Sequence, residues 1–479
     1  MRRPAGTQHD IAILLVGPYD PHCGEYTFLA PPLGVWRLKG VLSAHGITAE
    51  VFDPNCVGEG TTAEEAFAAR LRSRAWSVIG FSTTGMTLRF DLALAHQARA
   101  AAPKALIVAG GMEATFAPER MFALAPVDFV ILGEGERPLV ELARRMRAGE
   151  PLDGIAGTAR PAAGGTLERI PQRALDAGEL REAIFSTPYE EMPYETYWQR
   201  LEEAYAVGSL PTKAAREARL AEIRSVRLIT LNYCPMRCTF CSSTNFLNAA
   251  QDGTARIARL DADDCVTMMR RIVAAHPGVR TIIFQDDIFV FPTDHRILPL
   301  TEAILAAKKS GTLPESLQFI STNRVDAMTP ERIAAMRAAG FRVLGFGIES
   351  FSPSVLAEFN KSRIAPAIEP ALTAALACGV TPFLDIILTS PRATLADLAL
   401  TIGKAFRWIE AGCEVGMYPY VIPFTGAAMA SDPALLPQTR YTLQSIAGTA
   451  VRWQQPSTIL PFDPELRAVM ATVEELFAE

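Results

Sequence analysis

The stretch Cys234-Pro235-Met236-Arg237-Cys238-Thr239-Phe240-Cys241 places three cysteines in a C-x3-C-x2-C spacing. Cysteine thiolates are the usual ligands of iron–sulfur clusters, and three of them suit three corners of a cubane cluster. The fourth iron is then open, as expected of a catalytic metal site. A structural zinc site is the alternative, but it takes four protein ligands, commonly from two C-x2-C pairs. No second pair exists, so we expect Cys234, Cys238 and Cys241 to hold a catalytic cluster.

The rest of the composition indicates a reducing compartment and a small ligand. The other cysteines are scattered singly and are expected to be small buried apolar side chains, at Cys23, Cys56, Cys265, Cys378 and Cys413. The polar start Met1-Arg2-Arg3-Pro4 and the lack of an apolar run of about 18 residues or more predict a cytoplasmic protein without stable membrane insertion. A net charge of −6 disfavours binding to nucleic acid, so we expect a small-molecule or peptide-like substrate.

Residues 1–150 alternate short β-branched stretches with amphipathic ones, which predicts a parallel doubly wound sheet. We expect its strands at 11–16, 48–52, 78–82, 105–109 and 129–132. Ligands of such sheets lie beyond the carboxyl ends of the strands. The residues found there are Ser82, Thr83, Thr84, Gly110, Gly111, Gly133, Glu134, Gly135 and Glu136. No G-x-G-x-x-G follows the first strand, so a dinucleotide is disfavoured as the ligand of this domain. A nucleotide, a flavin and a corrinoid all stay possible as its ligand.

Taken in order, four motifs of this region resemble the cobalamin-binding domain fused to radical S-adenosylmethionine (SAM) enzymes. They are Pro31-Pro32-Leu33-Gly34, Gly80-Phe81-Ser82, Val108-Ala109-Gly110-Gly111 and Leu132-Gly133-Glu134-Gly135-Glu136. The resemblance implies a cobalamin site that includes Pro32, Leu33 and Gly34 together with the strand-end residues named above. Asp20-Pro21-His22-Cys23-Gly24-Glu25 departs from the D-x-H-x-x-G motif of cobalt-ligating histidines, because its glycine comes one residue early. We therefore expect His22 to be an ordinary loop residue. A domain of this fold that has lost its cofactor is the alternative.

A second α/β block follows residues 151–224, which we expect to form a linker with a turn near 160–166 between two short strands. The strands of the second block are predicted at 227–232, 281–284, 317–321, 342–346, 382–388 and 414–421, with helices at 261–275, 330–339, 366–378 and 395–411. Six such repeats predict a partial parallel barrel with its site at the strand carboxyl ends. The cysteine run follows the first of these ends, which supports the cluster interpretation.

The cysteine run, with Phe240 before the last cysteine, and the order of the two blocks resemble the cobalamin-dependent radical SAM enzymes. The resemblance implies a [4Fe-4S] cluster whose open iron binds SAM, and whose electron cleaves SAM to a 5′-deoxyadenosyl radical. It also implies SAM contacts from Phe240 in this run and, at later strand ends, from Gln285, Asp286, Asp287, Ser321, Asn323, Arg324, Glu349 and Ser350. Acids suit the ammonium and ribose groups of SAM. Capping or turn formation by these side chains is the alternative.

Later segments match the family less closely. Asn360-Lys361 matches a frequent pair of the family, but a surface lysine is the default interpretation. Leu388-Thr389-Ser390-Pro391 departs from the family's G-x-P-G-E-T turn. Tyr418 and Tyr420 would face substrate, although aromatic residues at strand spacing are more often core.

These observations predict a Rossmann-like cobalamin-binding domain (1–150), a linker region (151–224), a partial (β/α)6 TIM-barrel radical SAM domain (225–430) and a helical C-terminal extension (431–479). The leading hypothesis is hydrogen abstraction from the substrate, followed by methyl transfer from methylcobalamin to carbon. Such an enzyme needs an external one-electron reductant such as flavodoxin or ferredoxin. A non-methylating radical reaction, for example a cyclisation, ring contraction or dehydration, is the second hypothesis. A non-catalytic corrinoid or iron–sulfur carrier is the third.

Overall fold

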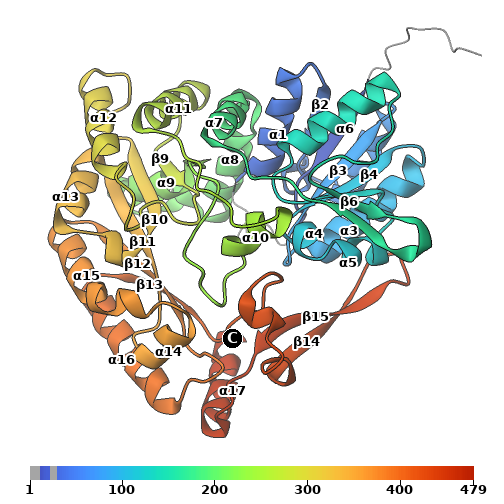
Figure 1. The fold of residues 1–479 in the computed structure, drawn as a ribbon. Coiled ribbons are helices and arrows are strands. Elements are labelled where there is room, and N and C mark those ends of the chain that lie inside the picture. Colours follow the sequence, from blue (N-terminus) through green and yellow to red (C-terminus); the bar gives the residue numbers. More distant parts are fainter. Residues whose placement is uncertain (1–10, 22–29, 479) are drawn as a thin grey trace, which may run out of the picture. The chain divides into compact units, whose positions relative to one another are not determined.

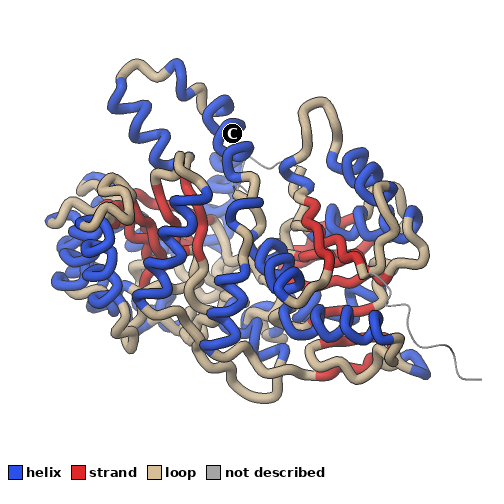
Figure 2. Tube along the Cα trace, turned by 90° about the horizontal axis from the view of Figure 1, so that it is seen from above, coloured by secondary structure: helices blue, strands red, loops and turns tan. Residues whose placement is uncertain are grey.

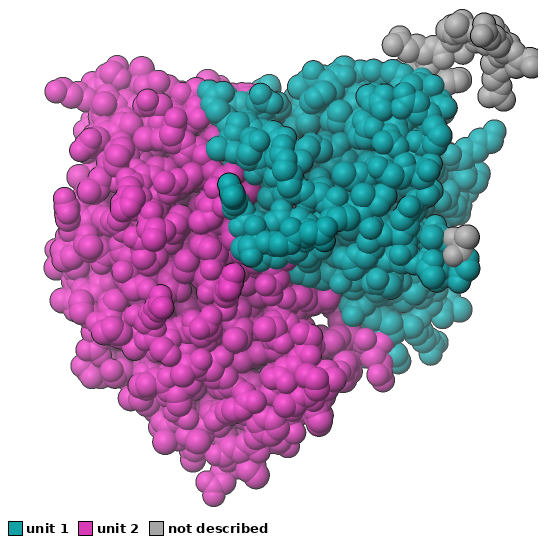
Figure 3. All heavy atoms as spheres, viewed as in Figure 1, with its two compact units in different colours: residues 1–201, 246–256, 443–453 teal, residues 202–245, 257–442, 454–479 magenta. Residues whose placement is uncertain are grey.

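The computed structural model describes residues 11–21 and 30–478, which form two compact units (Figure 3). The first unit contains residues up to Leu201 together with Phe246–Arg256 and Leu443–Trp453, and the second contains Glu202–Asn245, Ile257–Thr442 and the residues from Gln454 onward. In both units the strands lie between helices (Figure 2). No helix among the described residues is both long and apolar enough to cross a membrane.

The first unit is built on a seven-stranded sheet of order β2-β1-β3-β4-β5-β6-β7. Its strands are β1 (Ala12–Val16), β2 (Thr48–Phe52), β3 (Val78–Thr83), β4 (Leu106–Gly111), β5 (Phe129–Ile131), β6 (Thr158–Pro161) and β7 (Leu167–Ile170). The first five are parallel, and β6 and β7 are antiparallel. The predicted doubly wound sheet is therefore confirmed. Its order reverses between β1 and β3, and such a switch point is where ligands bind in open α/β sheets.

Helices flank this sheet (Figure 1). They are α1 (Leu33–Ala44), α2 (Ala63–Arg72), α3 (Leu88–Ala101), α4 (Met112–Phe116), α5 (Pro118–Leu124), α6 (Glu136–Ala148) and α7 (Ala177–Ser186). Local signals set their ends: Thr62 accepts a hydrogen bond from the Glu65 amide in a capping box, and α6 stops at Gly149 in the left-handed conformation. α1 packs beside α6 and α7, whereas α2 packs beside α3. The first turns of α1 and α6 thus flank the carboxyl ends of the strands.

The second unit holds a six-stranded parallel sheet in sequential order, as a partial barrel requires. Its strands are β8 (Ser225–Leu228), β9 (Thr281–Phe284), β10 (Gln318–Asn323), β11 (Phe341–Glu349), β12 (Thr381–Ile387) and β13 (Glu414–Tyr418). The helices are α9 (Lys213–Ile223), α11 (Ala262–Ala275), α12 (Ile297–Lys309), α13 (Pro330–Ala339), α14 (Pro353–Glu358), α15 (Ile368–Ala377), α16 (Leu395–Glu410) and α17 (Pro464–Ala478). The predicted barrel is confirmed.

The two faces of this sheet differ in burial, because successive side chains of a strand point to opposite sides. On β11, Leu344, Phe346 and Ile348 are fully buried, while Val343 and Gly347 on the opposite side are half-buried. α13 packs against β11 and α15 packs against β12, which accounts for the fully buried face. We call the other, half-buried face the inner face of the barrel.

Some elements contain residues of both units, namely α8 (Tyr194–Ala204), α10 (Ser243–Ala250) and the hairpin of β14 (Thr439–Ser445) and β15 (Arg452–Ile459). The hairpin corrects the expectation of a wholly helical tail, which holds only for α17. Both strands carry aromatic and β-branched residues, and Gly448 takes a positive φ in the connection between them. Ile446 joins the buried core of the first unit, so burial favours the hairpin over a helix.

Candidate functional site

The cysteine run forms the loop after β8. Cys234 is buried, Cys238 and Cys241 are half-buried, and all three are free thiols. Burial raises the pKa of Cys234 to about 12, and the charges of Cys241 and Cys238 contribute, so the three sulfurs lie near one another. Within the described residues, no group of three histidine, cysteine or acidic side chains is already arranged to hold a metal ion. Because burial disfavours the thiolate form, thiolates in this loop need a strong cationic partner such as iron.

One short segment after α14 supports this loop. Arg237 lies between two of the cysteines with a φ of 55°, and its carbonyl accepts a 2.9 Å hydrogen bond from Asn360 Nδ2. Thr239 Oγ1 donates to the Glu358 carbonyl at 2.8 Å, and Phe240 packs edge-on against Phe359 at 4.9 Å between ring centroids. Asn360 of the Asn-Lys pair thus holds the backbone of the cysteine loop.

The acids that follow β9 have different surroundings. The Asp286 carboxylate is buried and accepts hydrogen bonds from the Thr230 amide (2.6 Å), the Thr230 hydroxyl (2.6 Å) and the Leu231 amide (2.9 Å). These bonds tie the end of β9 to the chain that enters the cysteine loop. Burial raises the pKa of Asp286 to about 6, against the opposing charge of Arg296. Asp287 and Gln285 are exposed, and they are the members of this predicted SAM-binding turn that are open to a ligand.

The residues predicted at the end of β10 are largely paired with each other. Ser321 and Asn323 are buried, and Asn323 Nδ2 donates to the Ser321 carbonyl and hydroxyl at 3.0 Å each. Arg324 forms a two-bonded ion pair with Asp326, with both contacts at 2.8 Å. The predicted SAM contacts of these residues stay predictions, and their present partners give them a role in shaping the turn.

Glu349, at the end of β11, forms a buried ion pair with Lys361 at 2.8 Å. Lys361 Nζ also donates to the Gly347 carbonyl. The default interpretation of Lys361 as a surface residue was wrong, since it is 7% exposed. Ser350 is engaged elsewhere, because its hydroxyl bonds Thr401 at 2.8 Å and accepts from the Ser352 amide at 3.1 Å. Glu349 is therefore the member of this motif that carries a charge at the barrel site.

Asp385, in the middle of β12, is a polar residue of the barrel site that was not predicted from the sequence. In register it stands between Gly347 of β11 and Gly416 of β13. A Cβ at Gly347 would lie 2.6 Å from Glu349 Oε1 and 3.2 Å from Lys361 Nζ, so glycine keeps the space beside the ion pair free. Asp385 is half-buried on the inner face. The signal was available, since Asp385 is the single charge in an otherwise apolar strand.

The charges of Glu349 and Lys361 change the pKa values of other side chains on the inner face of the barrel. Burial and then the charge of Glu349 raise the pKa of Asp385 to about 6, while Lys361 lowers it. Tyr418 on β13 is half exposed, and burial together with the charges of Asp385 and Glu349 raises its pKa. Tyr420, in contrast, is buried. We call Glu349, Lys361, Asp385 and Tyr418 the barrel polar cluster.

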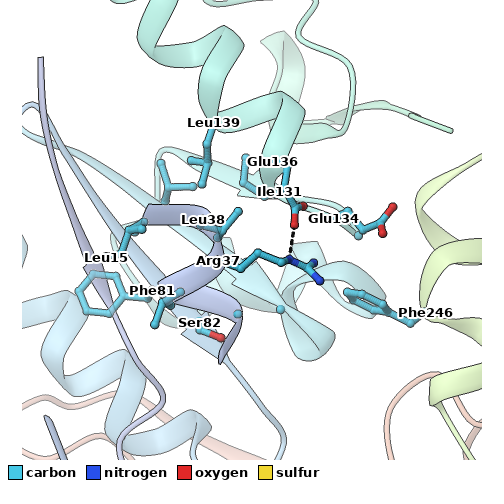
Figure 4. A pocket seen from close by; sticks show the side chains of 18 residues that line it. Leu15, Arg37, Leu38, Phe81, Ser82, Ile131, Glu134, Glu136, Leu139 and Phe246 are labelled. Atoms are coloured by element: carbon cyan, nitrogen blue, oxygen red, sulfur yellow. Dashed lines mark ion pairs between the residues drawn. The ribbon is translucent and has the colours of Figure 1, made fainter. Parts of the chain in front are cut away.

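In the first unit, a pocket of about 780 Å³, open mouth included, lies at the carboxyl ends of the strands (Figure 4). The pocket is lined by apolar and glycine residues with a few polar ones: Leu15, Gly34, Val35, Arg37, Leu38, Gly80, Phe81, Ser82, Val108, Gly110, Gly111, Ile131, Gly133, Glu134, Gly135, Glu136, Leu139 and Phe246. The enclosed space in the pocket is about 210 Å³, less than the roughly 300–1,000 Å³ of typical small-molecule pockets. The pocket therefore encloses only part of a large ligand.

Most of the residues predicted to bind cobalamin line this pocket. Pro32, Leu33, Thr83 and Thr84 are predicted contacts that do not line it. His22, which we expected to be an ordinary loop residue, lies outside the described residues. Glycine is required at Gly111, where φ is 95° and a Cβ would lie 2.6 Å from the Thr83 carbonyl oxygen. Arg37, Leu38 and Phe246 were missed, because a helix face or a distant segment supplies them. The predicted strand-end turns thus supply one side of the pocket and α1 supplies another.

The polar side chains of the pocket form one charged group. Arg37 Nε lies 2.5 Å from Glu136 Oε1. Glu134 Oε2 accepts a 2.6 Å hydrogen bond from the Leu175 amide, and burial followed by the charge of Glu136 raises the pKa of Glu134 to about 7. An apolar floor with a polar mouth fits an organic cofactor that has an aromatic part and a polar part.

Two family models match the chain and cover these two sites. The B12 binding domain matches residues 21–143, and the Radical SAM superfamily matches residues 228–405.

The chain belongs to the radical SAM proteins that carry a B12-binding domain.

A radical SAM domain implies a [4Fe-4S] cluster and SAM, and a B12-binding domain implies cobalamin, so the predicted cofactors are confirmed.

The chain is also similar to a curated relative, and it shares its fold with solved structures. The "Uncharacterized methyltransferase PH0819" of Pyrococcus horikoshii is 22% identical over 400 residues, which is 83% of this chain and 76% of the relative. The radical SAM methyltransferase TsrM from Kitasatospora setae, in a structure with tryptophan substrate and a SAM analogue, shares the fold at a TM-score of 0.72 with 16% identity, covering 98% of this chain and 88% of TsrM. The cobalamin-dependent SAM radical enzyme OxsB has a TM-score of 0.70 with 16% identity, covering 98% and 66%.

Proposed function

We propose that this radical SAM protein is a cobalamin-dependent methyltransferase that methylates a carbon atom of a small molecule after hydrogen abstraction. The observation that carries the proposal is the presence of both sites in one chain: a three-cysteine loop on a partial barrel and a ligand pocket in a B12-binding domain. The methyltransferase name of the Pyrococcus relative and the TsrM fold support it. An external one-electron reductant of the flavodoxin or ferredoxin type is part of the proposal.

When bound, the cluster supplies the electron that cleaves SAM, and the corrinoid carries the methyl group. Cys234, Cys238 and Cys241 would hold the cluster, and Asn360 fixes their loop. Asp287 and Glu349 are the acids placed to accept hydrogen bonds from SAM.

Asp385 and Tyr418 would orient a polar group of the substrate, since Asp385 has no hydrogen-bond or ion-pair partner among the described residues. The glycines beside it keep that part of the inner face free of side chains. The proposed domain boundaries, at residues 150, 224 and 430, place this cluster and the cysteine loop in the same domain.

Anaerobic turnover with methyl-labelled SAM tests the proposal. The protein is given a reductant, hydroxocobalamin and a metabolite extract of its source organism, and label is followed by mass spectrometry. We expect label on the bound corrinoid and then on a new carbon–methyl bond in one extract component. Formation of 5′-deoxyadenosine without any methylated product would instead support a non-methylating radical reaction. Absence of both would support a carrier.

Replacing Asp385 with asparagine should reduce formation of the labelled product about 10- to 100-fold, as expected when a hydrogen bond to a charged group is lost. SAM cleavage without substrate should stay within about twofold of the wild type, because Asp385 is not assigned to the cysteine loop. The rates of 5′-deoxyadenosine and product formation measure the two effects separately. Asp263→Asn, at an exposed position of α11, is the matched control. An equal loss of both rates in Asp385→Asn would place Asp385 in SAM binding instead.

A further inference from the structure

The first two residues of α10, Ser243 and Thr244, lie against the cysteine loop and belong to the same unit as the loop. The Arg237 amide donates to the Thr244 hydroxyl at 3.1 Å. The amides of Ser243 and Thr244 in turn donate hydrogen bonds to the sulfur of Cys241. Thr244 is also fully buried, at 2% exposed. The start of α10 therefore holds a defined position beside one of the three proposed cluster ligands.

The Ser243 side chain adds a hydroxyl at this position, and the hydroxyl has two neighbours. Ser243 Oγ is within hydrogen-bonding reach of the Cys241 sulfur and also of the Asp287 carboxylate, which follows β9. A carboxylate and a thiolate are both acceptors, whereas a serine hydroxyl has a single proton to donate. Ser243 therefore donates to Asp287 or to Cys241, but not to both.

The charge of Asp287 decides between these two acceptors. Hydrogen bonds to an ionised carboxylate are stronger than those to a neutral acceptor, so Asp287 holds the Ser243 proton as long as no cation is bound to it. A cation bound at Asp287 neutralises the carboxylate and frees the hydroxyl to donate to Cys241. Hydrogen bonds to the sulfurs of an iron–sulfur cluster are one of the factors that set its reduction potential. They favour the reduced form, because they stabilise its additional negative charge.

We propose that Ser243 is a positioning residue that links SAM binding to reduction of the cluster. When the SAM ammonium pairs with Asp287, the Ser243 hydroxyl turns to the Cys241 sulfur and makes the cluster easier to reduce. The electron comes from the external one-electron reductant, no covalent bond forms or breaks in this step, and the proton stays on the serine oxygen. The inference rests on the proposed function, which assigns the cluster to the cysteine loop and SAM to Asp287. Electrons are then directed to protein that has already bound SAM.

The reduction potential of the cluster tests this role without any turnover. Full-length protein with a reconstituted cluster is titrated anaerobically, with and without the SAM analogue aza-SAM, and the reduced cluster is followed by electron paramagnetic resonance. We expect the analogue to shift the potential upward in the wild type and in Ser243→Thr, which keeps a hydroxyl. In Ser243→Ala the upward shift should fall by about half or more, because the hydrogen bond to the cluster sulfur is lost.

A double-variant cycle separates the coupling through the hydroxyl from the direct effect of the Asp287 charge on the potential. Without the analogue, Asp287→Ala should raise the potential more in the wild-type background than in the Ser243→Ala background. Ser310→Ala is the matched control, since Ser310 lies at the exposed end of α12 and its hydroxyl donates to the Ala307 carbonyl at 3.0 Å. This control should have the potential of the wild type with and without the analogue.

An equal shift in Ser243→Ala and in the wild type contradicts the proposal, and so does an Asp287→Ala effect that is the same in both backgrounds. Loss of iron from Ser243→Ala also contradicts it, because the hydroxyl would then hold the cluster rather than adjust its potential. If the wild-type chain takes up no iron, the proposed catalytic cluster itself fails. Iron analysis of the wild type separates this outcome from the others.

Discussion

The Cys238→Ala variant should lose the cluster and reduce SAM cleavage to background. A cubane cluster needs its thiolate ligands, and a site with two remaining cysteines cannot hold it with one iron open to SAM. Anaerobically reconstituted wild-type protein should contain about four irons per chain in the cluster, whereas the variant should show neither that iron nor the cluster absorbance. The amount of 5′-deoxyadenosine formed with dithionite and SAM measures the loss of cleavage.

The control for this variant is a cysteine outside the loop. Cys378→Ala changes a half-buried thiol at the end of α15 and should keep the iron, the absorbance and SAM cleavage. The same loss is expected for Cys234→Ala and Cys241→Ala. Persistent SAM cleavage in any of the three loop variants would refute the proposed catalytic cluster.

The Lys361→Met variant should be much less stable to unfolding than the wild type. Lys361 and Glu349 have side chains only 8% and 10% exposed, and Lys361 also donates to the Gly347 carbonyl. Removing one partner of a buried ion pair leaves an uncompensated charge and typically costs about 3–5 kcal/mol. Thermal unfolding of the full chain, followed by circular dichroism, should show a lower midpoint for the transition of the second unit.

Adding Glu349→Gln to Lys361→Met should restore part of this stability, because the double variant no longer buries an unpaired charge. Lys404→Met, which breaks the surface pair of Lys404 with Glu369, is the matched control and should cost no more than about 1 kcal/mol. A double variant that is less stable than Lys361→Met would show that Glu349 is not the group that Lys361 neutralises.

The strands were predictable because their signals are local. Short apolar runs bounded by glycine or polar turns gave five strands of the first sheet and six of the second, close to their observed bounds. The tail failed for the opposite reason. Its hairpin depends on burial of Ile446 in a core formed by residues far away in the chain, and no local pattern records such a contact.

Site residues, too, were predictable where local sequence places them and not where they depend on packing between distant segments. Turns at strand ends, such as Gly110-Gly111 and the cysteine run, follow from the order of elements, since parallel strands place their ends at one edge. Arg37 could not be assigned from sequence, because the direction in which a helix residue points depends on how the helix packs. Lys361 was misjudged, because a lysine after a helix looks exposed until the ion pair with Glu349 is known. Asp286 carries the residue type expected of a ligand, but its oxygens are used by Thr230 and Leu231.

The segment 358–361 restricts how this protein can diverge in evolution. The Glu358 carbonyl accepts from the Thr239 hydroxyl and Asn360 donates to the Arg237 carbonyl, both in the cysteine loop, while Lys361, next along the chain, neutralises Glu349 at the barrel. On the proposed assignment of the cysteine loop to the cluster and of Glu349 to SAM, an insertion or deletion here would disturb both sites in a single event. We therefore expect the length of this short segment to be kept wherever the proposed radical chemistry is retained.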